Sequence, residues 1–517
     1  MLGNSKVEPA DVGAAARSGQ PARRTVAAAL ARRHWLAGVL LTAGLVLRVL
    51  AELAYRPALF YIDSNRYLYN ADGNDPVGYK GLLKTVLLVG NFDAVAAVQH
   101  VLGLAMAVVI YLLLLRRGVP RWLAALAMAP VLLDGYQLQI EQNIMPDTLF
   151  EALLLTGVAI LLWSPRITWR RAVAAGLALG LSATVAQVGE ALILPAVLFV
   201  LVAGGGGGRR TAARAAALLV ACAVPILAYS TGSLLLTGAF DLSHTGVTSF
   251  YGRTAAAADC ATIRLPAPER ALCPSPAQQA EGPDWLEYNA GSPVRPYYAD
   301  LPRAQADSEL SNFNHQVLIQ QPQRLARAYG RDVLKLFAVT RATQPGDTPI
   351  SRWQFQKTYP YFTSHATRKF ARTATERFGG GTPAVWRPVA AFLRSYQLGG
   401  GYTPGPLLVL LVLAGLAGSV AALLRRRLGG ADGALRQQAL ACLLFFGAGA
   451  FVTLVSDLFE FSWRYQLPVL VTLVPAGALG ISVIVSAVRG RPGASPAGAP
   501  AAGPAAGPGP EPESAGL

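Results

Sequence analysis

The sequence Tyr61-Ile-Asp-Ser-Asn-Arg-Tyr67 follows the first long apolar run of the chain, and Asn74-Asp-Pro-Val-Gly-Tyr-Lys80 comes shortly after it. Because apolar sequence flanks both stretches, we expect them to form a short polar loop against a bilayer surface. The loop holds carboxylates and cations together, which suits chemistry at a lipid phosphate. An ordinary solvated loop between two helices is the plainer alternative. A second polar cluster, predicted on the same side of the membrane, favours the functional interpretation.

The composition indicates the class of protein. Of the 517 residues, 53% are hydrophobic and 14% are charged, and the mean hydropathy is +0.38. A soluble domain carries roughly 25% charged residues, and several runs here approach the ~20 apolar residues that span a bilayer. We therefore predict an all-α polytopic membrane protein. Much of the net charge of +16 comes from arginines that flank apolar runs, as membrane orientation requires, so no nucleic-acid partner is expected.

About ten membrane spans are predicted. Arg23, Arg24, Arg32 and Arg33 precede the first apolar run, and the positive-inside rule places that end in the cytoplasm. Each later short basic loop then falls on the cytoplasmic side, and each short acidic or mixed loop falls outside. Both termini are therefore predicted to be cytoplasmic. The spans are expected at about 36–54, 93–115, 121–134, 148–163, 172–187, 190–204, 212–237, 405–424, 437–456 and 466–488.

This topology divides the chain into five parts. The arm 1–33 and the Pro/Ala/Gly tail 489–517 are predicted to be disordered. An N-terminal membrane module of about seven spans covers 34–237, and a C-terminal module of about three spans covers 405–488. The polar region 238–404 between them is predicted to be an extracytoplasmic domain of mixed structure.

Two stretches outside the spans show helical spacing of their apolar residues. The segment 79–89 is expected to lie along the membrane interface as a helix. The segment 313–337, which contains Gln321-Pro322, is predicted to be amphipathic.

The four cysteines fall into two pairs. Cys222 and Cys442 lie in apolar runs and are expected to be buried thiols. Cys260 and Cys273 lie close together in the long polar region. If that region is outside the cell, a disulfide between them is expected. Zinc binding is the weaker alternative, because no His or CxxC motif accompanies them.

Charged side chains gather on the predicted external face. Such groups are costly when they face lipid, so they tend to face a cavity and are candidates for a functional site. Asp147 follows Pro146 at a helix start, where a carboxylate also complements the helix dipole. For Arg464-Tyr465 the alternative is an interfacial anchor pair, whereas nothing local requires Glu141. The external set is Asp63, Arg66, Asp75, Lys80, Asp134, Glu141, Asp147, Glu190, Asp457, Glu460 and Arg464.

These motifs, in this order, resemble the GT-C superfamily of membrane glycosyltransferases. The closest likeness is to the bacterial polyprenyl-phosphate-dependent branch, with the protein mannosyltransferase-like and aminoarabinose transferase-like enzymes of glycosyltransferase family 39. It rests on the first-loop Asp63, on Gln139-Ile-Glu-Gln-Asn-Ile-Met-Pro-Asp-Thr-Leu-Phe150, and on Arg464-Tyr-Gln-Leu-Pro468. It covers about 36–240 well and 440–488 moderately. The family's common Asp-Glu pair in the first loop is Asp-Ser here.

The resemblance implies a GT-C-like helix bundle, a polyprenyl-phosphate sugar donor, an extracytoplasmic active site and inversion at the sugar. Asp63 matches the general base for the acceptor hydroxyl, and two second-loop acids match positions that place the acceptor or a metal. A divalent metal ion is thus left open as a cofactor. The candidate catalytic residues are Asp63, Glu141 and Asp147. The candidate donor-phosphate residues are Arg66, Lys80, Arg464 and Tyr465.

The predicted function is therefore a hexosyl- or pentosyltransferase of a bacterial plasma membrane. Its acceptor would be a cell-envelope glycan, lipid or protein. A transporter or flippase of lipid-linked sugars is the alternative, but it would carry ionisable or helix-breaking residues near mid-membrane. A polysaccharide polymerase or ligase would not need the early Asp. No GxGxxG fingerprint appears between a strand and a helix, which argues against a nucleotide-sugar donor.

Overall fold

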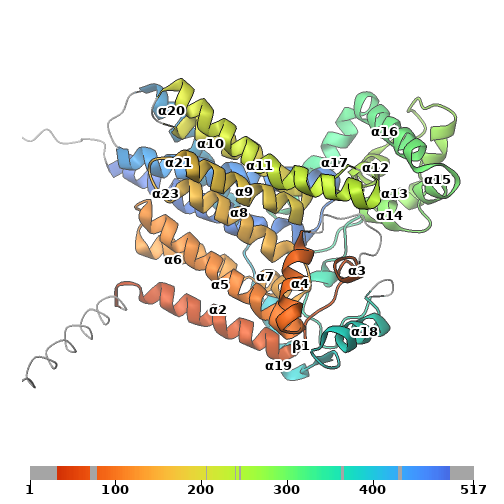
Figure 1. Cartoon of the computed structure of the whole chain (residues 1–517), viewed down its shortest axis with the longest axis horizontal. Coiled ribbons are helices and arrows are strands. Elements are labelled where there is room, and N and C mark those ends of the chain that lie inside the picture. Colours follow the sequence, from red (N-terminus) through yellow and green to blue (C-terminus); the bar gives the residue numbers. More distant parts are fainter. Residues whose placement is uncertain are drawn as a thin grey trace, which may run out of the picture.

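The computed structural model describes residues 32–69, 78–204, 207–238, 240–243, 246–362, 366–428 and 433–489. Predictions for the arm before residue 32 and the tail after residue 489 lie outside these residues. The described chain is mostly helical, with 3₁₀ helices labelled η (Figure 1).

The N-terminal module is built from long helices joined by short ones. Its elements are α2 (Trp35–Ala54), β1 (Tyr55–Arg56), α3 (Ser64–Tyr69), α4 (Tyr79–Val89), α5 (Phe92–Arg116), α6 (Arg121–Leu133), α7 (Gly135–Gln142), α8 (Asp147–Leu162), α9 (Trp169–Val185), η1 (Gln187–Leu192), α10 (Ile193–Ala203) and α11 (Gly208–Thr237). The helix expected over 79–89 is confirmed as α4.

The remaining elements comprise the long polar region and the C-terminal module. The polar region contains α12 (Gly246–Ala257), η2 (Pro268–Leu272), α13 (Pro276–Ala280), α14 (Pro283–Tyr288), α15 (Val294–Asp300), α16 (Arg303–Gln320), α17 (Pro322–Lys335), η3 (Ile350–Trp353), α18 (Arg368–Phe378), β2 (Ala384–Val385) and α19 (Arg387–Leu398). The C-terminal module contains α20 (Gly405–Leu428), α21 (Gly433–Phe459), η4 (Trp463–Gln466), α22 (Pro468–Val471) and α23 (Leu473–Arg489).

Six helical segments of the described chain are long and apolar enough to cross a membrane. Counting α6 and α7 as one span bent by 49° makes seven. The predicted spans 4 to 6 coincide with α8, α9 and η1–α10, which are shorter than these six. Ten spans therefore stays a prediction. The six segments are Trp35–Ala54, Phe92–Arg116, Gly208–Leu235, Gly405–Leu424, Gly433–Phe459 and Trp463–Val488.

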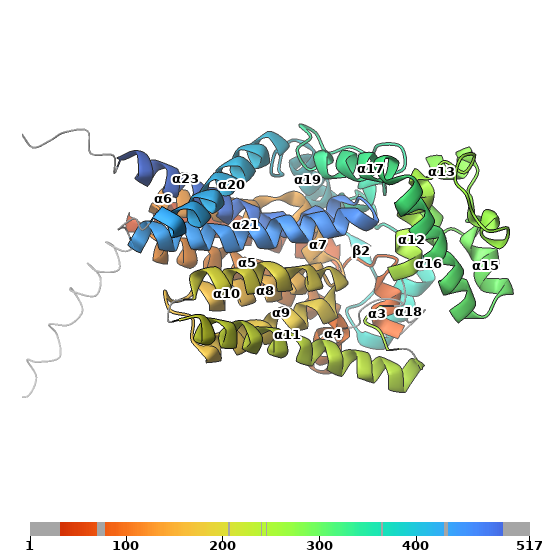
Figure 2. The ribbon, with the colours of Figure 1, turned by 90° about the horizontal axis from the view of Figure 1, so that it is seen from above.

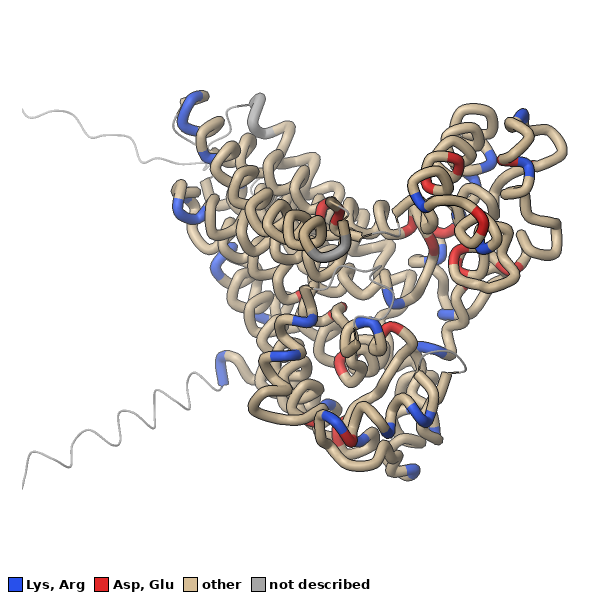
Figure 3. Tube along the Cα trace, turned by 45° about the vertical axis from the view of Figure 1, so that its right-hand side comes forward, with Lys and Arg blue, Asp and Glu red and all other residues tan. Residues whose placement is uncertain are grey.

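The long helices run side by side, and the elements α12–α16 lie beyond one end of the bundle (Figures 1 and 2). The beginning of α2 and the end of α23 both lie at the opposite end of the bundle (Figure 1). Figure 3 shows lysines and arginines at the helix ends there, whereas acidic residues concentrate toward the other end. Lysines and arginines at the ends of membrane helices on one side are the pattern on which the positive-inside rule rests.

Close helix packing in the bundle depends on small residues. At Gly176 and Gly180 of α9, an added Cβ would collide with the backbone carbonyl oxygens of Leu218 and Cys222 in α11. Glycine at these positions lets two helix backbones approach, as is common between helices in membranes. Cys222 and Cys442 are buried free thiols, as expected.

The polar region differs from the single mixed domain that we expected. Its described secondary structure is helical apart from the two-residue strand β2, which pairs antiparallel with β1. Residues 251–317 share a hydrophobic core of their own, on which the disulfide Cys260–Cys273 packs. By contrast, Trp353 and Phe355 belong to the cores of the bundle. The region is thus divided between a small helical unit and segments that pack on the membrane helices.

Candidate active site

The segments that precede α3 and α8 are joined side by side. The backbone N–H of Leu59 donates to Gln142 O, and the N–H of Ile144 donates to Leu59 O, both at 2.9 Å. Ser64, at the start of α3, is fully buried and donates through Oγ to Ile144 O at 3.0 Å. Its Oγ also accepts the N–H of Tyr61 at 2.9 Å. A buried serine therefore ties the two segments together.

This connection brings Asp63, just before α3, near Asp147 at the start of α8. Arg464 of η4 lies between the two carboxylates. Its Nη1 is 3.1 Å from Asp63 Oδ2, and its Nε is 3.2 Å from Asp147 Oδ1. The three side chains are only 11–19% exposed. Residues separated by hundreds of positions in sequence therefore form one charged group.

Aromatic rings hold the Arg464 guanidinium in place. Its centre lies 4.7 Å from the Tyr465 ring and 5.2 Å from the Trp353 ring, and its Nη2 donates to Tyr465 Oη at 3.3 Å. Arg66 supplies a second cation, 3.8 Å from Asp63 and 5.4 Å from the Tyr288 ring. A planar guanidinium suits this combination of ring contact and carboxylate pairing better than an ammonium group does.

These side chains line a cavity of about 1150 Å³. Its inner part is lined by residues of α8, α9, η1 and α21 and by the charged group, and its outer part by residues of α14 and α15 and by Arg352 of η3. Asp63, Arg66, Asp147, Arg464 and Tyr465 all line it. Glu190 and Glu460 of the predicted external set line it as well.

The outer part of the cavity has its own ion pair. Arg352 Nη1 lies 3.3 Å from Asp284 Oδ2 and donates to Tyr61 Oη at 3.2 Å. Burial raises the pKa of Asp284 above its usual value, although the Arg352 charge opposes this shift. Burial also raises the pKa of Glu460 well above its usual value, and the Asp284 carboxylate adds to the effect. Both shifts reflect carboxyl groups held in a poorly solvated cavity.

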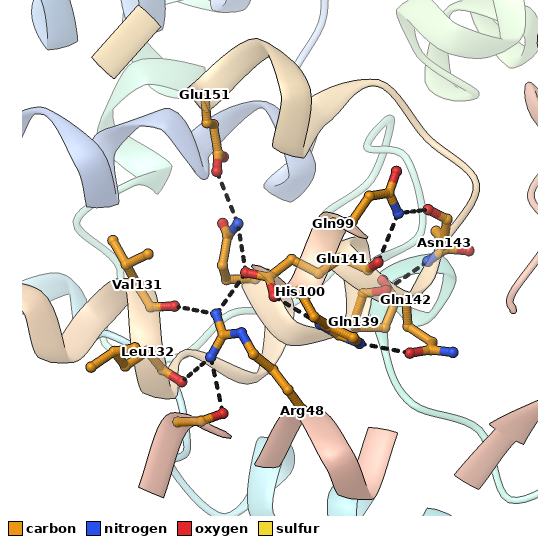
Figure 4. A network of polar contacts seen from close by, with 12 residues as sticks. Arg48, Gln99, His100, Val131, Leu132, Gln139, Glu141, Gln142, Asn143 and Glu151 are labelled. Atoms are coloured by element: carbon orange, nitrogen blue, oxygen red, sulfur yellow. Dashed lines mark hydrogen bonds and ion pairs between the residues drawn. The ribbon is translucent and has the colours of Figure 1, made fainter. Parts of the chain in front are cut away.

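Glu141 does not join this cavity. It is fully buried in α7, where its Oε1 accepts from Arg48 Nη2 at 2.7 Å and its Oε2 lies 2.9 Å from His100 Nδ1 (Figure 4). Arg48, itself 2% exposed, also donates to the backbone oxygens of Gly44, Val131 and Leu132. The segment 134–147, expected to be an external loop, thus contains a short helix buried on every side.

The buried network continues through glutamines (Figure 4). Gln99 of α5 donates to the backbone oxygens of Glu141 and Asn143, each at 2.7 Å. Gln137 donates to Glu151 of α8 at 2.9 Å. Because the network joins α2, α5, α7 and α8, it fixes the helices on both sides of the segment that leads to Asp147.

Other predicted residues have different positions. Lys80 is buried at 8% exposure and does not line the cavity. Asp134 is the N-cap of α7, accepting from Tyr136 N–H at 2.9 Å and pairing with Arg341 at 3.1 Å. Asp75 lies outside the described residues.

The polar region also holds the segment that carries Arg464. Arg253 of α12 donates to the backbone oxygens of Asp457 at 2.9 Å and of Phe459 at 3.1 Å. It pairs with Asp332 of α17 at 2.5 Å. These contacts anchor the end of α21, just before η4, so the polar region helps to set the position of Arg464.

Several of these residues were missed by sequence analysis. The sequence around Arg48 does mark this residue, because a lone charge inside an apolar run is a candidate for a functional or paired group. The sequence does not single out Arg352, Asp284 or Arg253, because they lie in a long polar region where charged residues are common.

The sequence leaves a divalent metal ion open as a cofactor. In the described chain, no cluster of three or more His, Cys, Asp or Glu side chains could hold a metal ion. Asp63 and Asp147 both face the Arg464 guanidinium. The reaction considered below is derived from these side chains.

Comparison with known proteins gave one loose likeness. No protein-family model and no curated protein matches this chain. Its structure is similar to that of the archaeal oligosaccharyltransferase AglB from Archaeoglobus fulgidus, solved in complex with an inhibitory peptide and a dolichol-phosphate. The two share 14% sequence identity with a TM-score of 0.40, over 90% of this chain and 53% of that chain. This chain thus spans about half the length of AglB. The functional conclusion rests on the site itself.

Proposed function

We propose that the protein is an integral-membrane glycosyltransferase that moves a sugar from a polyprenyl-phosphate donor to an extracytoplasmic acceptor. The observation that carries this proposal is the group formed by Asp63, Arg464 and Asp147 in a cavity of about 1150 Å³. Two elements that line the cavity, α3 and α14, lie toward the end of the bundle opposite the beginning of α2 and the end of α23 (Figure 1). In a plasma membrane with both termini in the cytoplasm, the cavity would open on the extracytoplasmic side.

Asp63 is assigned as the general base. It is 19% exposed and lines the cavity, so an acceptor hydroxyl can reach it. As the hydroxyl oxygen forms its bond to the anomeric carbon, Asp63 takes the proton. The bond from that carbon to the phosphate oxygen breaks at the same time, and the phosphate leaves with the electron pair. Displacement from the opposite face inverts the anomeric centre.

The cations are assigned to the leaving group. Negative charge grows on the phosphate as the glycosidic bond breaks, and fixed cations in a poorly solvated site stabilise it. Arg66 and Arg464 line the same cavity as the base. Asp147 holds the Nε side of Arg464 and thereby orients its other N–H groups. Tyr465 packs on and accepts from the same guanidinium.

The donor's lipid chain requires an apolar surface next to this charged group. Phe150, Val185, Val188, Val455 and Phe459 line the same cavity. They belong to α8, α9, η1 and α21, which are elements of the bundle. A lipid-linked donor can therefore place its phosphate at the arginines and its chain along the apolar wall.

The test is sugar release from a panel of radiolabelled polyprenyl-phosphate sugars by the full-length protein in detergent. Wild type should turn over one donor, and Asp63→Asn should lower the rate by about 10²–10⁴-fold, as expected for loss of a general base. Asp300→Asn is the matched control, because Asp300 is exposed and does not line the cavity. Turnover by Asp63→Asn at the wild-type rate would refute the assignment of the base.

A transporter or flippase of lipid-linked sugars is the second candidate. The buried group of Arg48, His100, Glu141 and Glu151 favours it, because ionisable residues within membrane helices often mark transport paths. None of these four side chains lines the cavity, however, and Arg48 and Glu141 neutralise each other. Saturable binding of a lipid-linked sugar without turnover of any donor would support transport over transfer.

A further inference from the structure

The outer part of the cavity is left unused by the reaction at Asp63. Pockets for one small molecule have volumes of roughly 300–1,000 Å³, so a cavity of about 1150 Å³ has room for a second substrate. Its outer wall carries the aromatic rings of Trp285 in α14 and Tyr298 in α15, whereas the rings of Tyr288 and Trp353 face Arg66 and Arg464. The second substrate therefore meets flat apolar surfaces.

The arginines of this wall are engaged by protein groups. Arg352 pairs with Asp284 at 3.3 Å, and Arg303 lies 3.7 Å from Asp307. Arg295 donates to a backbone oxygen, that of Tyr288, at 2.6 Å. The acidic residues Asp284, Glu287 and Glu460 line the cavity beside these three arginines. The charges of the wall therefore balance, and a neutral ligand can bind there.

Carboxyl groups are the polar groups available to such a ligand. Glu460 Oε2 is buried and has no hydrogen-bond partner within the described residues, although Glu460 lines the cavity. Burial raises the pKa of Glu460 well above its usual value, which favours its protonated form, whereas Asp284 pairs with Arg352 at 3.3 Å. A carboxylic acid both donates and accepts hydrogen bonds, as a hydroxyl group does. A ligand with several hydroxyl groups would satisfy the orphaned oxygen.

From these features we infer that the outer part of the cavity is a binding subsite for a neutral carbohydrate, the acceptor of the transferred sugar. Trp285 and Tyr298 would pack against the apolar faces of sugar rings, and Glu460 and Asp284 would bind ring hydroxyls. Calling this carbohydrate the acceptor rests on the proposed function, whereas its binding to the subsite does not. Among the three acceptor classes expected from sequence, it selects the glycan.

A peptide acceptor fits the subsite less well. Extended peptides commonly bind by adding a strand to an exposed sheet edge. In the described chain the sheet consists of the two-residue strands β1 and β2, and neither lines the cavity. Rings and carboxyl groups are the recognition surface instead.

The test measures equilibrium binding of neutral oligosaccharides to the full-length protein in detergent, without a donor. The probes are manno-, gluco- and arabino-oligosaccharides of two to four sugar units, with a Ser/Thr-rich peptide beside them. We expect one saccharide series to bind wild type. Trp285→Leu and Glu460→Gln should each weaken that binding by about tenfold, the loss typical of one ring contact or one hydrogen bond to a charged or buried group.

Matched controls come from the same region. Trp386→Leu and Glu376→Gln change exposed residues that do not line the cavity, so saccharide binding should be unchanged. Glu460→Gln nearly preserves shape, so it stays informative if Trp285→Leu fails to fold.

Two results would overturn the inference: no saccharide binding by wild type, or peptide binding that the two cavity variants abolish. Donor turnover, measured on the same preparation, separates the two proposals. Saccharide binding without turnover of any donor would keep the subsite and reject the transferase. Turnover of a donor without saccharide binding would keep the transferase and reject the subsite.

Discussion

Replacing Glu141 with leucine should destabilise the protein without altering the cavity. Glu141 and Arg48 are 2.7 Å apart with side-chain exposures of 0% and 2%. At an effective dielectric constant of about 20, their attraction is about 6 kcal/mol. Removing one partner leaves the other charge buried without compensation, a change that typically costs about 3–5 kcal/mol.

Two features place the expected loss of stability toward the lower end of this range. Arg48 keeps its bonds to the backbone oxygens of Gly44, Val131 and Leu132, so the guanidinium stays partly solvated by protein. Hydrogen bonds between membrane helices also contribute only about 0.6 kcal/mol on average, so the neutral members of the network add little. We expect Glu141→Leu to lower the free energy of unfolding by about 3 kcal/mol.

The assay is unfolding by SDS in mixed micelles, completed as a double-mutant cycle with Arg48→Met. The double variant leaves neither charge buried without a partner. Its loss of stability should therefore be smaller than the sum of the two single losses, with a coupling energy of at least about 2 kcal/mol. Asp259→Asn is the control, because its pair with Arg324 is 34–53% exposed and such pairs are worth about 0–1 kcal/mol. A loss for Glu141→Leu no larger than the control, or strict additivity in the cycle, would refute the reasoning.

Three further outcomes are expected. Gly103→Ala should destabilise the same network, because an added Cβ would collide with Glu141 Oε1 and lie 2.7 Å from Arg48 Nη2; a wild-type SDS midpoint would contradict this. Arg464→Lys should lower donor turnover by about 10²-fold, since an ammonium cannot face two carboxylates and two rings at once; kcat within a few-fold of wild type would count against it. Cys260→Ser should make residues 246–320 more sensitive to protease, because opening a loop with a sequence separation of 13 costs about 3 kcal/mol. Alkylation of both cysteines in the unreduced wild-type protein would show that the disulfide is absent.

The sequence by itself determined much of the helical framework. The first apolar run, expected at 36–54, is the helix Trp35–Ala54, and the segment expected at 79–89 is α4. These elements follow from hydrophobicity and spacing within about twenty residues, which is information that a short window of sequence contains. The same kind of information singled out Asp63, Asp147 and Arg464, because charges at the ends of apolar runs stand out locally.

Only the tertiary structure decided which of these charges meet. Asp63 and Arg464 are 401 positions apart, and Arg48 and Glu141 are 93 apart. The sequence around each of these residues does not identify its partner, since pairing depends on how whole helices pack. The sequence therefore predicts Glu141 beside Asp63 and Asp147. In the structure Glu141 instead pairs with Arg48, a cation inside the first helix, and lies within the bundle. The outer wall shows the same limit, because Asp284 and Arg352 acquire a role only when the polar region folds over the ends of the helices. A charge is specified locally, but the low-dielectric surroundings that decide its partner come from residues far along the chain.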